Sequence, residues 1–83
     1  MKVIFAKSAA RELRRLNRAI QDRIRRKLRF YASQTNPLNF AKLVKDFRFG
    51  NWRFRIGDYR IIFDIEKDKI VVLKIGHRKD IYK

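Results

Sequence analysis

The chain has 83 residues, no cysteine, and 23 lysines and arginines against 8 acidic residues, for a formal net charge of +15. This length fits a single domain, residues 1–83, and the missing cysteines exclude disulfides and thiolate metal sites. A hydrophobic share of 46% argues against a disordered chain. The apolar runs are too short to span a membrane or to form a signal peptide, so we expect a cytoplasmic protein without a membrane partner.

The first half of the chain predicts a strand followed by two helices. Val3-Ile4-Phe5 is a short apolar run between lysines, which is typical of a strand, and Ser8 is a candidate N-cap. Apolar residues then recur every three or four positions, which indicates helices over about 8–16 and about 18–34, with Asn17 near the break. One continuous helix is the alternative.

The helical half also carries most of the positive charge. Residues 1–35 hold eleven lysines or arginines and two acidic residues, which leaves +9 of the total +15. Like charges on neighbouring turns repel one another, so this surface needs packing, counterions or a partner to offset the repulsion. The charge therefore predicts a polyanionic or acidic partner, without naming one.

The second half predicts a loop and then a sheet. Pro37 lies in a loop that ends the second helix, and the short stretch 40–43 is ambiguous. Three segments with tight turns between them are typical of strands: Trp52–Ile56, Tyr59–Ile65 and Lys69–Ile75. The order is β-α-α-β-β-β. The expected fold class is α+β, with a two-helix hairpin packed on one face of a small, mainly antiparallel sheet.

The first predicted hairpin brings arginines together. If Gly57-Asp58 is a two-residue loop, Arg55 opposes Arg60, and the alternation of side chains puts Arg53 on the same face. Like charges placed opposite each other destabilise a sheet, so we expect a bound phosphate or carboxylate to remove the penalty. The apolar residues expected on the other face, toward the helices, are Phe54, Ile56, Ile61, Phe63 and Ile65.

The last predicted strand leads into further polar residues. If it pairs back along its neighbour, Gly76 returns near Arg60, and His77, Arg78 and Tyr82 lie at the same end of the sheet. Four arginines, one histidine and one tyrosine would then converge on one concave face. The register is uncertain, because residues 69–75 place apolar side chains on both faces.

Such a set suits metal-free chemistry on RNA. The sequence contains no Gly-rich phosphate loop and no cluster of metal ligands, and Asp64 and Glu66 flank the far turn, away from the arginines, so we expect neither a metal nor a cofactor. Arginines bind phosphates and stabilise the extra charge of a phosphorane-like transition state. RNA carries its own 2′-hydroxyl nucleophile, so orientation, charge stabilisation and proton transfer are sufficient.

Five pieces of the sequence, in this order, are "FAKSAARELRRL", "IRRKL", "NPLNFAKL", "WRFRIGDYRIIF" and "IGHRKDIYK". Together they resemble the RelE/ParE superfamily of toxins from type II toxin–antitoxin systems, over essentially the whole chain. The resemblance implies a RelE-like fold and a toxin that inhibits translation by cutting mRNA in the ribosomal A site. It also implies three partners: the ribosome with its RNA, mRNA, and a RelB-like antitoxin.

The resemblance further implies residue roles. Arg53 and Arg55 would hold the substrate, and Arg60, Arg78 and Tyr82 would form the catalytic set. Some relatives have lysine at positions 53 and 55, whereas arginine stays charged and cannot act as a base. Proton transfer is then left to Tyr82, to His77 or to a ribosomal group.

Two alternatives to the nuclease stay open. One is a ParE-like toxin that inhibits DNA gyrase, a branch that shares the fold and generally lacks this catalytic set. The other is a non-catalytic module whose basic surface only holds nucleic acid or antitoxin.

Overall fold

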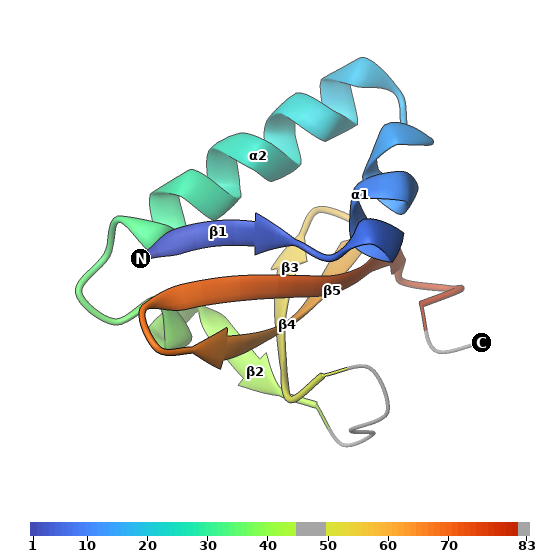
Figure 1. Ribbon diagram of the computed structural model, residues 1–83. Helices are drawn as coiled ribbons and strands as arrows, with labels where there is room; N and C mark the ends of the chain where they lie inside the picture. The colour runs from blue at the N-terminus through green and yellow to red at the C-terminus, as the bar shows by residue number, and fades with distance from the viewer. Residues whose placement is uncertain (45–49, 82–83) are drawn as a thin grey trace.

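Within the residues that the computed structural model describes, 1–44 and 50–81, two α-helices pack on one face of a five-stranded sheet (Figure 1). The elements are β1 (Lys2–Phe5), α1 (Lys7–Arg14), α2 (Arg18–Ala32), the 3₁₀-helix η1 (Pro37–Phe40), β2 (Ala41–Leu43), β3 (Trp52–Ile56), β4 (Tyr59–Glu66) and β5 (Lys69–His77). The strand order is β1-β5-β4-β3-β2, with β1 parallel to β5 and the other neighbours antiparallel. The predicted fold class is confirmed, and the ambiguous stretch 40–43 supplies β2.

Asn17 separates the two helices, as predicted. Its side chain accepts a hydrogen bond from the Ile20 amide at 3.0 Å and caps the N-terminus of α2. The prediction that Ser8 caps α1 is wrong, because the helix already begins at Lys7 and the Ser8 hydroxyl donates instead to the Leu73 carbonyl at 3.3 Å. Neither helix in the described part of the chain is long and apolar enough to cross a membrane.

A bulge in β5 explains its apolar residues on both faces. Phe63 of β4 opposes Val72, whereas the preceding Ile62 opposes Lys74, so Leu73 is an extra residue on β5. The shift by one residue lets Ile75 join Val72 in the core beneath the helices. A strict two-residue alternation cannot describe this strand.

α1 covers the edge of β5 beyond the end of β1. The Ala6 amide donates to the Val72 carbonyl at 2.8 Å, which is the last backbone bond along this edge before the helix. Past the bulge, the Ile75 amide donates to Oε1 of Glu12 at 2.9 Å. The carboxylate of Glu12 thus takes the place of a neighbouring strand for one partly buried amide.

A column of stacked aromatic rings joins α2 to the sheet. The Tyr31 ring stacks on Phe54 with the ring centroids 4.4 Å apart, and Phe54 stacks on Phe63 at 4.2 Å. On its other side Tyr31 stacks on Phe40 of η1 at 5.1 Å. Burial in this column raises the pKa of the Tyr31 hydroxyl above its ordinary value of 10.0.

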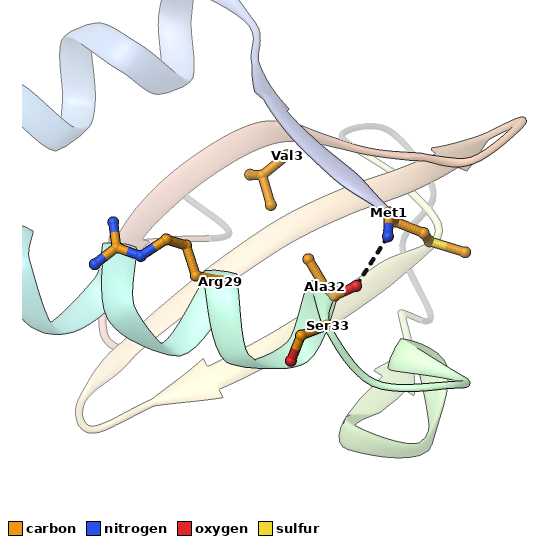
Figure 2. Close-up of a pocket in the computed structure, with 5 residues that line it drawn as sticks. All are labelled: Met1, Val3, Arg29, Ala32 and Ser33. Carbon is orange, nitrogen blue, oxygen red and sulfur yellow. Dashed lines mark hydrogen bonds between the residues drawn. The ribbon is translucent and has the colours of Figure 1, made fainter.

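The end of α2 lies beside the start of β1 (Figure 2). The Met1 ammonium donates to the Ala32 carbonyl at 2.9 Å, one of the last carbonyls of the helix, which have no partner within it. The positive charge also complements the negative end of the helix dipole. Val3, Arg29 and Ser33 complete the lining of a pocket of about 510 Å³ at this junction.

We expect Glu12→Ala to lower the free energy of unfolding by about 1–3 kcal/mol, because the Ile75 amide is left without its acceptor. Glu12→Gln keeps an acceptor oxygen at the same place and should cost about half as much or less. Urea unfolding followed by circular dichroism measures both values. Equal losses in the two variants would contradict the role assigned to this side chain.

Tyr31 should make stability fall at alkaline pH. Because the folded-state pKa of its hydroxyl lies above the unfolded value, its contribution is fully present below about pH 10 and is lost as the pH rises through the folded-state pKa. Tyr31→Phe should therefore flatten the decline of the urea midpoint above about pH 10. Lysine titration affects both proteins alike, so parallel declines would refute this origin.

Candidate functional site

The outer face of the sheet, opposite the helices, carries the arginines of the β3–β4 hairpin. Arg55 opposes Arg60, as predicted, and alternation puts Arg53 on the same side; we call this surface the arginine face. Gly57 has a φ of +58° at the first loop position, as in a type II′ turn. Of the residues predicted to face the helices, four lie in the core and the fifth, Ile65, is partly buried against it; the four are Phe54, Ile56, Ile61 and Phe63.

Lys42 also belongs to the arginine face, which its sequence did not predict. It lies on β2 directly opposite Arg53, so a second pair of like charges follows the Arg55–Arg60 pair. Cross-strand partners share a face of the sheet, which places Lys42 among the arginines. The only signal was a basic residue within the ambiguous stretch 40–43.

Arg60 is the most buried member of the arginine face. Its relative exposure is 9%, whereas Arg55 is exposed and Arg53 is half-buried. Arg60 lies between Arg55 on one side and Gly76 on the other, and its Nη1 donates to the Tyr59 carbonyl at 3.4 Å. Burial has already restricted the rotamers of this side chain, so binding an anion there costs little further side-chain entropy.

Gly76 lets the chain beyond β5 return over the arginine face. Gly76 opposes Arg60, and a methyl group in its place would lie 2.9 Å from Cδ1 of Ile81. Ile81 is 1% exposed and packs with Val44 and Ile62 in a small cluster on this face. The glycine therefore makes room for the chain end beside Arg60.

Arg78 lies at the same end of the sheet, as predicted. Its amide donates to the Asp58 carbonyl at 2.7 Å, and its Nε lies 3.7 Å from Oδ1 of Asp58. Both side chains are more than half exposed, so this ion pair contributes little stability. A phosphate can therefore compete with Asp58 for the guanidinium.

His77 lies on the other face of the sheet, and the prediction that it converges with the arginines is wrong. It opposes Tyr59, which packs against the helix-side core, and the two rings meet edge to face at 5.6 Å. The reason is alternation: the neighbour of an outward Gly76 points inward. Its Nδ1 accepts from the Lys79 amide at 3.2 Å, and its carbonyl accepts from the Ile81 amide, so His77 shapes the turn that carries Arg78.

Two further residues named in the sequence analysis remain, Tyr82 and Asp64. Tyr82 lies outside the described residues. Asp64 accepts a hydrogen bond from the Asn51 amide at 2.6 Å, which ties down the start of β3. Within 1–44 and 50–81 there is no group of three side chains suited to hold a metal ion.

The fold and this site define a small α+β protein with helices on one sheet face and a basic cluster on the other. The family model for the ParE toxin of the type II toxin–antitoxin system, parDE, matches residues 3–82. Toxin RelE3 of Methanocaldococcus jannaschii is 34% identical over 86 residues, which cover 99% of this chain and 96% of the relative. The chain belongs to the RelE/ParE family of type II toxins, as its sequence predicted.

Two solved structures share the fold. A chain of the RelBE2 toxin–antitoxin complex from Mycobacterium tuberculosis has a TM-score of 0.74 and 26% identity, over 93% of this chain and 96% of its own. A chain of the RelB–RelE antitoxin–toxin complex from Methanococcus jannaschii has a TM-score of 0.70 and 28% identity, over 96% and 95%. The architecture is thus that of a RelE-like toxin along nearly its whole length.

We expect Arg55→Thr to stabilise the isolated protein by about 0.5–1 kcal/mol, because it removes a like charge opposite Arg60 and places a β-branched residue in a strand. The same change should reduce the stabilisation gained from added inorganic phosphate. Thermal unfolding with and without phosphate measures both effects. The control is Arg15→Thr, which removes the same charge at the end of α1; if it behaves like Arg55→Thr, the effect is one of net charge alone.

Proposed function

We propose that this toxin is a ribosome-dependent endonuclease that cuts mRNA, inhibits translation, and requires no metal ion or cofactor. The observation that carries the proposal is the placement of Arg60, nearly buried between Arg55 and Gly76 with Arg78 at the same end of the sheet. Guanidinium groups held in place are suited to stabilise charge that develops on a phosphate. The similarity to a protein named Toxin RelE3 supports the same activity.

The proposed reaction is an intramolecular attack within the RNA. The 2′-oxygen forms a bond to the adjacent phosphorus, the bond from phosphorus to the 5′-oxygen breaks, and the 2′-hydroxyl proton is removed while the 5′-oxygen gains one. Arg55, Arg60 and Arg78 hold the phosphate and stabilise its added negative charge. The products are a cyclic phosphate end and a 5′-hydroxyl end.

We assign the proton transfer to Tyr82 or to a ribosomal group. His77 faces the helix side of the sheet, where its ring contacts Tyr59 and the Lys79 amide. We propose that it positions Arg78 by closing the turn that follows β5 and does not touch the substrate.

Two partners are proposed, one from the charges and one from the solved relatives. The helical half and Lys42 would contact ribosomal RNA through phosphates, a contact that weakens as salt rises. A RelB-like antitoxin is the proposed protein partner, because both structural relatives are toxin–antitoxin complexes.

Inhibition of DNA gyrase is the second candidate, favoured by the ParE description of the matching family model. Expression of the chain without an antitoxin separates the possibilities. Cuts in mRNA that are phased with codons are the result expected for the proposed nuclease. Intact mRNA with trapped gyrase–DNA complexes would favour the gyrase inhibitor. If neither signal appears, the remaining candidate is a non-catalytic binding module.

Single substitutions should separate chemistry from positioning. We expect Arg60→Lys to lower mRNA cleavage about 100-fold, because lysine keeps the charge and loses the guanidinium fork, and Tyr82→Phe to lower it comparably. His77→Asn should lower it less than about threefold, because an asparagine oxygen can accept the amide two residues on. Primer extension on ribosome-bound message measures the cuts.

Two results would overturn these assignments. Unchanged mRNA cleavage in both Arg60→Lys and Tyr82→Phe would show that the arginine face takes no part in the cleavage reaction. A loss in His77→Asn as large as in Arg60→Lys would return His77 to the catalytic set. Circular dichroism of each variant shows that the fold is retained.

A further inference from the structure

A pocket of about 420 Å³ lies on α2, on the helix side of the sheet and away from the arginine face. Its described lining consists of Arg23, Arg26, Lys27 and Phe30. Their spacing of three, four and seven residues puts all four side chains on one side of the helix. Three cations thus gather beside one aromatic ring, in a space of the size that small ligands occupy. We call this site the α2 pocket.

The three cations of the α2 pocket have no acidic partner. Within 1–44 and 50–81 the side chains of Arg23, Arg26 and Lys27 make no hydrogen bond or ion pair, and all three are exposed. Asp22 lies on the same helix but pairs with Arg18, at 3.4 Å. The repulsion between cations on neighbouring turns is therefore not offset inside the chain, and a bound polyanion would offset it.

Phe30 offers an aromatic ring on which a ligand can stack. Its contacts with Tyr31 and Phe40 are both edge to face, with centroids 5.9 and 5.7 Å apart, and Phe30 is 49% exposed. Tyr31 and Phe40 stack on each other at 5.1 Å, and Tyr31 also stacks on Phe54 in the core, so the rings beside Phe30 are held in place. An ordered aromatic ring suits a nucleobase, because every base has a π-face that stacks on such a side chain.

The ring and the outermost cation are separated by about the length of a nucleotide. Seven residues lie between Arg23 and Phe30 along the helix, a rise of about 10 Å, which is close to the reach from the base to the last phosphate of an extended nucleoside triphosphate. A methyl group at Gly57 would lie 2.9 Å from Nη1 of Arg23, so this guanidinium rests against the β3–β4 turn. Both ends of the α2 pocket are thus supported by neighbouring elements, which lowers the entropy lost on binding.

We propose that the α2 pocket binds a free purine nucleoside triphosphate, with the base stacked on Phe30 and the phosphates held by Arg23, Arg26 and Lys27. A purine is favoured because its larger ring system covers more of the Phe30 face. The side chains of the four lining residues carry no acceptor that would distinguish adenine from guanine. A single RNA strand fits less well, because it carries one negative charge per nucleotide, whereas a triphosphate gathers several beside one base.

The inference goes beyond the proposed nuclease and does not depend on it. The α2 pocket lies on the helix side of the sheet, whereas Arg55 and Arg60 lie on the opposite face. Nucleotide binding is measured without ribosomes or mRNA, so the failure of one proposal leaves the other standing. Because the arginine face also attracts phosphates, the experiment compares variants of both surfaces.

The experiment measures binding of ATP and of inorganic tripolyphosphate to the isolated protein by calorimetry. The buffer contains about 0.15 M salt, which screens charges farther apart than about 8 Å. ATP should bind more tightly than tripolyphosphate by about fivefold or more, because only ATP has a base to stack. Phe30→Leu keeps an apolar side chain and removes the ring, so it should weaken ATP binding about fivefold or more and change tripolyphosphate binding less than about twofold.

Arg26→Gln should weaken the binding of both ligands about fivefold or more, because both have the phosphates that this side chain would hold. The matched control is Arg18→Gln, the same substitution on the opposite side of α2 at a side chain that is 84% exposed. It should change the binding of either ligand less than about twofold. In NMR spectra, ATP should shift the ring protons of Phe30 upfield by stacking, and tripolyphosphate should leave them in place.

Four results would overturn the proposal. Equal affinities for ATP and tripolyphosphate would show that the base makes no contact, and equal losses in Arg26→Gln and Arg18→Gln would show attraction by net charge alone. A larger loss in Arg55→Thr than in Arg26→Gln would place the nucleotide on the arginine face. If an oligoadenylate displaced ATP at an equal concentration of nucleotides, the α2 pocket would be a site for RNA strands. Unchanged circular dichroism of the variants shows that each loss is local.

Discussion

The register of the β3–β4 hairpin is the constraint on which both the core and the arginine face depend. On the helix side it pairs Trp52 with Phe63, Phe54 with Ile61, and Ile56 with Tyr59. Burial of each such side chain contributes about 1.5–3 kcal/mol, whereas one pair of opposed like charges costs less than about 1 kcal/mol. A slip by one residue would expose this entire apolar set. The core therefore holds Arg55 against Arg60 despite their repulsion.

The segment that follows β5 is the second part of the chain on which the site depends. Without a side chain, Gly76 leaves a space beside Arg60, and Ile81 fills it from the returning segment. The side chain of His77 accepts the Lys79 amide in the turn that follows β5, and the Arg78 amide in the same turn donates to the Asp58 carbonyl. The site thus joins a hairpin whose register is set by the core to a turn whose course is set by one glycine. The hairpin and the turn are each formed by residues close together in the sequence, and they lie side by side because β5 pairs with β4.

Local alternation explains what the sequence could predict. The hairpin, the Arg55–Arg60 pair and the break at Asn17 each follow from a few neighbouring residues. The bulge at Leu73 does not, because nothing in a run of apolar residues marks which one is extra. The contact from Glu12 to the Ile75 amide joins positions 63 residues apart, and only the packing of α1 on β5 creates it. Lys42 was missed because three residues are too few to show a strand period.

The distribution of charge gives the two faces different tasks. Positive charge on the arginine face is concentrated in strands whose backbones are held by neighbours, which suits an anion bound at one place. Positive charge on α2 lies on a helix, where like charges on successive turns weaken the element that carries them. A polyanionic or acidic partner bound along the helices would offset that repulsion. Such a partner would therefore stabilise the toxin through the face that does not carry its proposed chemistry.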